Sequence, residues 1–296
     1  MKRNFKDGVH NISNDIYHGS DGVSRSGLWL LKQAPAYYYN RYINPYYVDH
    51  KTNKNLIMGN LVHCLTLEPE LFDTDYVVTP ELKALPKVGL LKDIGREEFD
   101  AQKSMRLKIE EINKNVMDEF QNNLQGKQVI AQDVYSTAKK IAGSVLKDEF
   151  STSLLEGAKI EQSIYWTHEA TGIQCKARPD AWLGNIIIDL KTTADGSYRN
   201  FQRSAYNYGY FLQAGMISEA LKSVGVEMEK FIILSVEKVE PYATATFVLD
   251  DDSIQYGIDL FNKLMQDFKQ CKDDNRWPAY PLQTLSLPNY ANLEEL

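Results

Sequence analysis

Two aspartates and a lysine stand at a spacing that could hold a divalent metal ion and activate water. An Arg-Pro-Asp segment ends at Asp180, and after eight further residues an Asp-Leu-Lys segment runs from Asp189 to Lys191. On a β-strand Asp189 and Lys191 point to the same face, and a hairpin would bring Asp180 beside them. Paired carboxylates repel each other unless they bind a cation, and Mg²⁺ prefers such oxygen ligands. The lysine could then orient or deprotonate an attacking water, with its pKa lowered by the metal and by partial burial.

The ordinary explanation for an Asp-x-Lys pattern in a strand is an exposed hairpin with a weak surface ion pair. Two neighbouring features argue against that explanation. The residues Ile186 to Ile188 directly precede Asp189, so the strand is expected to be buried on both faces. Pro179 precedes Asp180 and indicates a strand end or bend rather than a strand interior. We therefore interpret the three charged residues as a buried site.

The elements that would position these residues follow from hydrophobic periodicity. Strands are predicted at 159–167, 173–183, 185–190, 230–239 and 242–249, with a tight turn at Gly184-Asn185. Helices are predicted at 24–34, 57–67, 96–124, 132–147, 202–223 and 253–271, the third of them exposed, and a loop at 80–95. This order predicts an α/β or α+β fold in which helices flank a central mixed β-sheet.

The chain contains no convincing linker and no internal repeat, so we predict one domain over residues 1–296. It would comprise a helical half at 1–150, a catalytic sheet core at 151–272 and an extended tail at 273–296. The net charge of −7 argues mildly against nucleic-acid binding, although local charge decides such binding.

The cysteines and the apolar segments bear on the cellular setting. Three scattered cysteines fit neither a disulfide framework nor a zinc motif. No apolar run reaches membrane-spanning length, and the N-terminus lacks the apolar core of a signal peptide. We therefore expect a cytoplasmic protein without membrane association.

The charged triad also resembles the signature of PD-(D/E)xK nucleases, and further motifs extend this resemblance. In chain order they are Ser24-Arg25-Ser26-Gly27-Leu28 with Pro35 and the tyrosines at 37–39, Met58-Gly59 with His63 and Leu67-Glu68-Pro69, and Tyr210 three residues before Gln213. Together they are similar to the C-terminal nuclease domain of exodeoxyribonuclease VIII (RecE), and they extend over roughly residues 10–265. The resemblance implies a restriction-endonuclease-like core.

The resemblance assigns a role to each matching residue. Asp180 and Asp189 match the metal-ligand carboxylates, and Lys191 matches the catalytic lysine. His63 matches a helical histidine that helps to bind the metal, although a histidine in an apolar helix is more often a core residue. Gln213 matches a glutamine that supports the lysine or the substrate, and the alternative is a core amide bonded to the backbone.

Two further positions are less clearly assigned by these motifs. Glu161, on the strand before the hairpin, is a candidate additional metal ligand, and the alternative is a solvated strand glutamate. The family often has a tyrosine four residues after the glutamine, where this chain has Ile217. Tyr206, Tyr208 and Tyr210 are candidates to take over the substrate contacts of that tyrosine.

Candidate substrate-binding residues lie on both sides of the triad. The helix start at Ser24, Arg25 and Ser26 offers N–H groups, hydroxyls and a guanidinium to a terminal 5′-phosphate, with ordinary N-capping as the alternative. The tyrosines between 37 and 47 could stack on bases, although packing is the commoner role. Basic residues that could bind the DNA backbone, or simply form a solvated face, are Lys176, Arg178, Arg199 and Arg203.

The resemblance implies a Mg²⁺-dependent exonuclease, with Mn²⁺ as a substitute, that degrades one strand of duplex DNA from its 5′ end. It would leave 3′ single-strand overhangs for phage-type recombination. The chain contains no P-loop, which agrees with ATP independence. The resemblance further implies a homo-oligomeric ring that acts on double-stranded DNA ends together with a RecT-like single-strand annealing protein.

Three alternatives share this signature. A PD-(D/E)xK endonuclease is the first, although the histidine helix and the Leu-Glu-Pro segment argue against it. A Cas4-like nuclease would carry four cysteines for an iron–sulfur cluster, and this chain has three scattered ones. A catalytically inactive DNA-binding or assembly module of the same fold is disfavoured because Asp180, Asp189 and Lys191 are all present.

Overall fold

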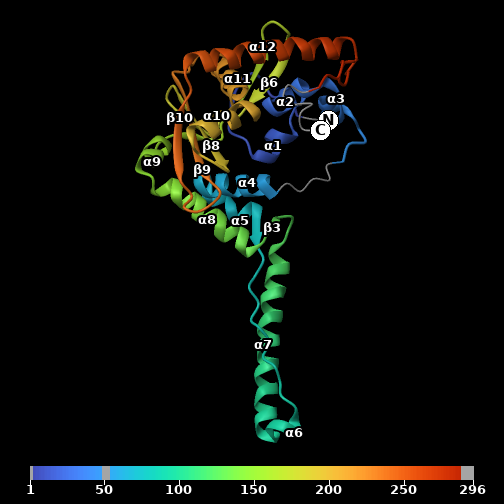
Figure 1. The fold of residues 1–296 in the computed structure, drawn as a ribbon, viewed down its shortest axis with the longest axis vertical. Coiled ribbons are helices and arrows are strands. Elements are labelled where there is room, and N and C mark those ends of the chain that lie inside the picture. The colour runs from blue at the N-terminus through green and yellow to red at the C-terminus, as the bar shows by residue number, and fades with distance from the viewer. Residues whose placement is uncertain (1–2, 49–53, 288–296) are drawn as a thin grey trace, which may run out of the picture.

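The computed structural model describes residues 3–48 and 54–287, which form a layered body with a long projecting arm (Figure 1). Within these residues a five-stranded sheet lies at the centre of the body. Across the sheet the strands are β10 (Thr244–Val248), β9 (Lys230–Glu237), β8 (Ile186–Thr193), β7 (Ala181–Leu183) and β4 (Lys159–Ile160). Since β8 and β9 are parallel and the other neighbours antiparallel, the predicted mixed sheet is confirmed.

The position of β8 at the centre of this sheet follows from its composition. Its β-branched residues suit a strand that is covered on both faces. Ile187 belongs to the apolar core on one face, whereas Ile188 and Leu190 belong to the core on the other. Because side chains alternate along a strand, Asp189 shares the face of Ile187. The predicted burial of this strand is confirmed.

Helices cover both faces of the central sheet. One face packs against α2 (Arg25–Gln33), α11 (Tyr210–Ser223) and α12 (Asp251–Asp273). The other packs against α4 (Lys54–Leu67), α8 (Gln132–Lys147) and α9 (Glu149–Leu155). The helices α11 and α12 approach closely where Gly215 faces Gly257, since a Cβ at Gly215 would lie 2.1 Å from the carbonyl carbon of Gly257.

A second, antiparallel sheet contains β1 (Gly8–His10), β5 (Ser163–His168) and β6 (Ile173–Ala177). The predictions of single strands at 159–167 and 173–183 are therefore wrong, because each run divides between the two sheets. The first run breaks at Glu161, whose φ of +52° lies in the left-handed region. The second breaks at Pro179, which has no N–H to donate to a strand ladder.

The predicted helix at 202–223 is divided into α10 (Tyr198–Asn207) and α11. Gly209, between them, has a φ of +71° that a residue with a side chain rarely adopts. The ring of Trp29 packs so closely here that a Cβ at Gly209 would lie 2.5 Å from Trp29 Cε3. Tertiary packing thus overrides the helical periodicity of this segment.

Several short elements were not predicted from the sequence. They are α1 (Asn14–Gly19), α3 (Pro35–Tyr38), η1 (Tyr39–Ile43), η2 (Pro69–Leu71), α5 (Phe72–Asp75), α6 (Leu91–Ile94), β2 (Tyr76–Val78) and β3 (Gln128–Ile130). One of them, the helix α6, lies within the segment that was predicted to be a loop. The half at 1–150 therefore contains strands as well as helices. The chain after Asp273 has no regular structure up to residue 287, as predicted for the tail, and its last residues, 288–296, lie outside the described part. Among the described helices, none combines the length and apolar character needed to cross a bilayer.

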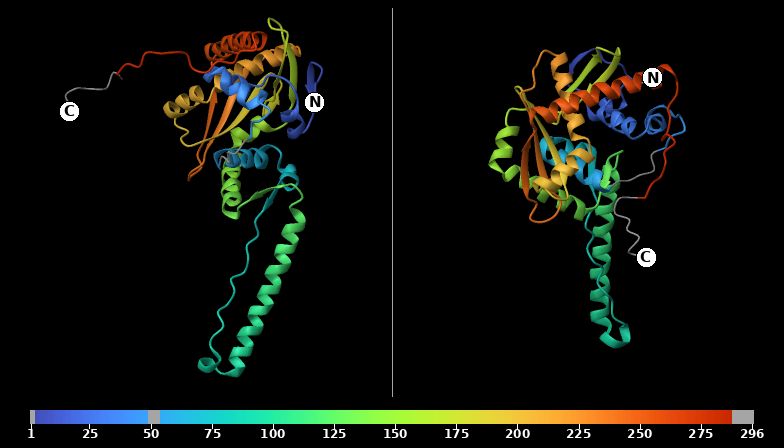
Figure 2. Two further views of the ribbon diagram at one scale, coloured as in Figure 1. Left: turned by 90° about the vertical axis from the view of Figure 1, so that its right-hand side faces the viewer. Right: turned by 45° about the horizontal axis from the view of Figure 1, so that its top comes forward.

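The arm consists of α7 (Arg96–Asn123) and of the extended segment 79–90, which runs alongside it (Figure 2). The two are joined by reciprocal hydrogen bonds between Asn113 and the backbone of Lys83, of 2.9 and 2.8 Å. Not one residue of α7 is buried, so the exposed helix predicted here is confirmed. The arm leaves and re-enters the body through the parallel pair of β2 and β3.

Candidate active site

The hairpin formed by β7 and β8 brings the two aspartates together. Ala181 pairs with Ile188, so Asp180 stands beside Asp189 at the start of β7. Asp180 accepts a hydrogen bond of 2.8 Å at Oδ2 from the backbone N–H of Leu190. This confirms the predicted convergence of the two carboxylates.

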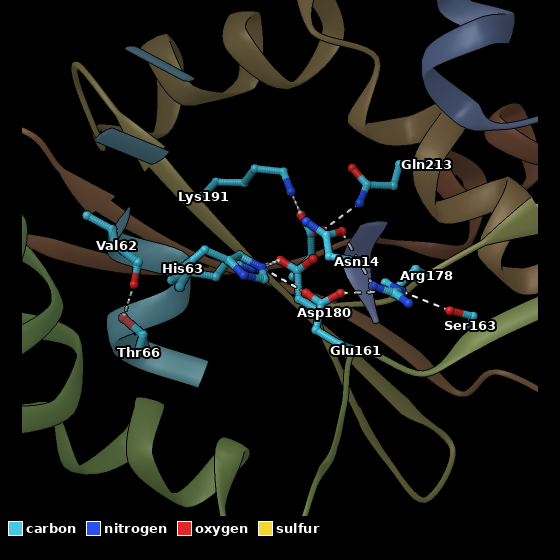
Figure 3. A network of polar contacts seen from close by, with 12 residues as sticks. Asn14, Val62, His63, Thr66, Glu161, Ser163, Arg178, Asp180, Lys191 and Gln213 are labelled. Carbon is cyan, nitrogen blue, oxygen red and sulfur yellow. Dashed lines mark hydrogen bonds and ion pairs between the residues drawn. The ribbon is translucent and has the colours of Figure 1, made fainter. Parts of the chain in front are cut away.

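His63 reaches the same point from α4 (Figure 3). Its Nε2 lies 3.1 Å from Asp180 Oδ2 and 3.5 Å from Glu161 Oε1. The side chains of His63, Glu161 and Asp180 each offer a ligand atom, and these atoms lie within 4.8 Å of one another. His63 is thus directed toward the carboxylates rather than absorbed into the apolar core.

Glu161 is held in place by its backbone and by an arginine. Its N–H donates to the carbonyl oxygen of Asp180 at 3.1 Å, and its Oε2 lies 3.6 Å from Arg178 Nε. It stands just after β4 in the left-handed conformation, which differs from the strand position predicted for it. Such conformations cost free energy and persist where the surroundings fix them. The solvated alternative for Glu161 is wrong, because only 16% of its side chain is exposed.

Lys191 and Gln213 both contact Asp189, which is fully buried. Lys191 Nζ lies 2.5 Å from Asp189 Oδ2, and Gln213 Nε2 donates to Asp189 Oδ1 at 2.6 Å. Gln213 therefore bonds to the site carboxylate, not to the backbone. Within the described part of the chain, Asp189 Oδ2 has an ion contact but no hydrogen bond of acceptable angle.

Burial and mutual repulsion set the ionisation of the three carboxyl groups. Burial opposes the charge of Asp180, but the His63 and Lys191 cations outweigh it and lower the pKa of Asp180 to about 2. Burial and the charge of Asp180 raise the pKa of Glu161 to about 7. Burial, only partly offset by Lys191, raises the pKa of Asp189 to about 6. The carboxyl groups of this site therefore differ in charge near neutral pH.

The two basic groups are held in their charged forms by these neighbours. Burial alone lowers the pKa of His63, but Asp180 and Glu161 outweigh that effect and raise it to about 9. Burial likewise opposes the charge of Lys191, and Asp189 and Asp180 reverse it, so the pKa of Lys191 is raised. The pKa is raised in the metal-free site because two carboxylates lie near the ammonium group, and the lowered pKa expected for Lys191 beside a bound metal stays a prediction.

The donor set fits a hard divalent cation. Carboxylate oxygens from Asp180, Glu161 and Asp189, with an imidazole nitrogen from His63, are the ligand types that Mg²⁺ and Mn²⁺ accept. The ligand atoms of His63, Glu161 and Asp180 lie within 4.8 Å of one another, a spacing that a single ion could bridge. The residues therefore fit the metal that the sequence predicts.

A cleft of 1330 Å³ opens over this site, and the predicted phosphate-binding residues line it. Ser24 Oγ caps α2 by accepting from Gly27 N at 3.4 Å, so the N-capping alternative applies to Ser24. Arg25 points inward, where its guanidinium donates to the carbonyl oxygen of Tyr208. Arg25 Nε is buried without a hydrogen-bond partner among the described residues, while Ser26 is exposed beside it.

Two of the four basic residues expected at the DNA backbone are buried instead. Arg178 is 6% exposed and donates to Ser163 Oγ at 2.9 Å and to the carbonyl oxygen of Ile12 at 2.6 Å. Lys176 is also 6% exposed and donates to backbone carbonyls of the α1 region. Their charges are paired within the protein, and Arg178 positions Glu161, although both side chains also line the cleft and the substrate-binding role of Arg178 stays a prediction.

The tyrosines lie in two settings. In the 37–47 cluster, Tyr38 is buried and stacks on Trp277 with ring centroids 5.4 Å apart, so packing is its role. Tyr210 lines the cleft, and its ring centroid lies 5.3 Å from Lys191 Nζ. Tyr206 is 54% exposed on α10, outside the cleft.

Two aromatic side chains beside the site, Tyr17 and Trp29, were not predicted from the sequence to lie there. The ring of Tyr17 lies against Arg178 and Lys176, at 4.5 and 4.8 Å, and supports both cations. Trp29 packs beside Lys32 and the Gly209 turn. Trp29 and Lys32 are three residues apart in a helix, and this spacing could have predicted that their side chains contact each other.

Comparison with known proteins agrees with this geometry. Residues 24–283 match the family described as a PDDEXK-like domain of unknown function (DUF3799). The crystal structure of a candidate exonuclease from Eubacterium rectale is similar, with a TM-score of 0.55 and 16% identity over 93% of this chain and 97% of that one. The structure of the protein SSO0001 aligns with a TM-score of 0.28 and 16% identity over 70% of this chain and 85% of that one. None of the curated protein sequences is significantly similar.

Proposed function

This chain belongs to the PDDEXK-like family DUF3799, and from that premise we propose that it is a Mg²⁺-dependent deoxyribonuclease. The observation that carries the proposal is that Asp180 and Lys191 line one cleft while the fully buried Asp189 contacts Lys191, with His63 and Gln213 bonded to the two aspartates. An inactive module would have no reason to keep buried carboxylates and a lysine together, since burying such charges costs free energy.

The chain's own residues would divide the work of phosphodiester hydrolysis. Asp180, Asp189, Glu161 and His63 would hold the divalent ion, which supplies Lewis-acid stabilisation and a water of lowered pKa. Lys191, on the same face as Asp189, would orient the attacking water and stabilise charge on the phosphate.

We further propose an exonuclease that acts on ends of double-stranded DNA without ATP, in the 5′-to-3′ direction. Arg25 lines the cleft at the start of α2, its Nε has no hydrogen-bond partner among the described residues, and its position supports the capture of a terminal 5′-phosphate. The similar E. rectale protein, a candidate exonuclease, supports this reaction over internal cleavage. A recombination role with a single-strand annealing partner, and a homo-oligomeric ring, remain proposals from the sequence resemblance.

The test is cleavage of linear and covalently closed circular duplex DNA, with 5′ and 3′ labels on the linear substrate. We expect Mg²⁺ or Mn²⁺ to support release of 5′-label as mononucleotides from linear DNA, and closed circles to stay intact. Asp189→Ala should reduce the rate at least about 1000-fold without unfolding the protein, because it removes a metal ligand and the partner of Lys191. Cutting of closed circles would favour an endonuclease, and full activity of Asp189→Ala would refute the assigned site.

A further inference from the structure

Aromatic and basic side chains lie next to one another outward from the catalytic lysine, some in direct contact and others joined through Gly209 or a shared hollow. We call this group the outer path, and its members are Tyr210, Tyr208, Trp29, Lys32, Tyr206 and Arg203. The residues come from α2, from α10, from the turn that follows α10 and from the first position of α11. The path thus joins segments that are far apart in the sequence.

The inner end of the outer path touches the active site. Lys191 Nζ lies 5.3 Å from the ring centroid of Tyr210, whose ring lies 6.1 Å from that of Tyr208 at an interplanar angle of 32°. The carbonyl oxygen of Tyr208 accepts a hydrogen bond from Arg25 in the cleft. The packing of Trp29 on Gly209 fixes this turn, so the rings have a defined position relative to the cleft.

The outer end combines cations with aromatic rings. Lys32 Nζ lies 4.3 Å from the ring centroid of Trp29 and 5.4 Å from that of Tyr206. Tyr206 and Arg203 border a second hollow of 570 Å³. Ammonium groups over ring faces are attracted by the π-electrons, so the alternation of charge and ring is itself stable.

The exposure of these rings indicates a ligand. Tyr206 and Tyr208 are 54% and 60% exposed, so they contribute little to the core. The chain carries 40 acidic residues, yet none occurs in residues 24–48 or 196–218, the two segments that build the path. The two segments therefore contribute only basic charges, such as those of Lys32 and Arg203, which favours contact with a polyanion despite the net charge of −7.

We propose that the outer path binds single-stranded nucleic acid next to the catalytic centre. Tyr206 and Tyr208 stack on bases, while Lys32 and Arg203 contact phosphates. Stacking on exposed rings is tolerant of sequence, because every base offers a π-face. This inference rests on the proposed nuclease function, and it adds a strand-holding surface outside the cleft.

The test is binding of a fluorescein-labelled oligothymidylate, measured by fluorescence anisotropy in EDTA so that no cleavage occurs. The double variant Tyr206→Ala/Tyr208→Ala should bind at least about tenfold more weakly, since two stacking contacts are lost. Lys32→Ala should bind about threefold more weakly and reduce the dependence of affinity on salt concentration.

Two matched control variants lie on other surfaces. Lys139 stands 5.4 Å from the ring of Tyr135 on α8, so Lys139→Ala removes a comparable lysine–tyrosine contact. Phe150→Ala removes a ring that is 56% exposed on α9. Both controls should keep the wild-type affinity for the oligonucleotide.

The possible outcomes test the outer path as a binding surface independently of the proposed nuclease function. Wild-type affinity in a folded Tyr206→Ala/Tyr208→Ala protein would overturn the outer path, whatever the cleavage assay gives. An equal loss of affinity in Phe150→Ala would do the same, because binding would then not be local. A wild-type protein that binds the oligonucleotide through these tyrosines but cleaves no DNA would overturn the proposed function and leave the binding surface standing.

Discussion

Asp180, Glu161 and Asp189 place three carboxyl groups in the interior beside three basic side chains. In the metal-free protein His63 contacts Asp180 and Glu161, Arg178 contacts Glu161, and Lys191 contacts Asp189. Burial, together with the repulsion from Asp180, raises the pKa values of Glu161 to about 7 and of Asp189 to about 6. A site of this kind trades folding stability for the capacity to bind a cation.

This arrangement predicts how the stability of the metal-free protein depends on pH. The folded pKa values of Asp189, Glu161 and His63, about 6, 7 and 9, lie above their unfolded values. Each group therefore contributes stability that is complete below its unfolded pKa and lost as pH rises through its folded pKa. We expect the melting temperature in EDTA to fall by several degrees between about pH 6 and pH 9, and Mg²⁺ to reduce that fall.

The control for this pH dependence is the double variant Asp189→Asn/Glu161→Gln, which removes two of the three groups. Its thermal stability should change less over the same pH range, although it should be inactive. Asp180 acts in the opposite sense: its pKa of about 2 contributes stability that is lost only in strong acid. A wild-type profile that is flat from neutral to alkaline pH would contradict this account.

Single residues differ in how far the sequence could predict their place. Asp180, Asp189 and Lys191 follow from strand alternation and one hairpin, and His63 and Gln213 follow from the family resemblance. Arg178 does not, because its burial depends on the Ile12 carbonyl and the Tyr17 ring, which come from an N-terminal segment with no predicted contact. The exposure of a charged side chain is decided by distant backbone that no local pattern specifies.

At the scale of elements, long helices with strong hydrophobic periodicity were predicted correctly from the sequence. Short strands and helix breaks that depend on tertiary packing were not. The prediction for residues 132–147 matches α8, and the one for 253–271 falls within α12. The three-residue strands β1, β2 and β3 are too short to show alternation. The break between α10 and α11 depends on Trp29, so it is a tertiary effect that a helical pattern cannot contain.

The close crossing of α11 and α12 predicts that replacing a helical glycine by alanine lowers the stability of this protein, the opposite of the usual effect. Alanine normally favours a helix over glycine by about 1 kcal/mol. Gly215→Ala should nevertheless destabilise the protein by about 1–3 kcal/mol or more, because its Cβ would lie 2.1 Å from the Gly257 carbonyl carbon. Chemical denaturation of both proteins measures the difference.

The matched control is Gly143→Ala in α8. Nothing lies within 4 Å of a Cβ at Gly143, so only helix propensity acts there. This variant should be as stable as the wild type or up to about 1 kcal/mol more stable. If Gly215→Ala were stabilised equally, the close helix contact would not exist in solution.

At the scale of the whole molecule, the body and the arm are held by different forces. The body has an apolar core on each face of its central sheet. The arm has no buried residue in α7, and Figure 1 shows it projecting away from the body, with the short helix α6 at its tip. An isolated exposed helix gains little from packing, so the arm contributes little to the stability of the body.

Removal of residues 80–127, replaced by a flexible Gly/Ser linker of about eight residues, should leave the body folded. We expect its melting temperature to stay within a few degrees of the wild type, with a loss of helical circular dichroism that corresponds to α7. Cleavage of linear DNA should persist, because no site residue belongs to the arm. An insoluble or inactive deletion protein would show that the arm has a structural or catalytic role.

The parallel pair of β2 and β3 has a consequence for the evolution and engineering of this chain. Both ends of the arm are fixed at one small edge of the body, so insertions or deletions between Thr79 and Gln128 need not displace the sheet. Natural selection can therefore vary the length of this segment independently of the chemistry. The same property makes the loop around α6, at the tip, a suitable place for a fluorophore or an affinity tag that reports on the intact enzyme.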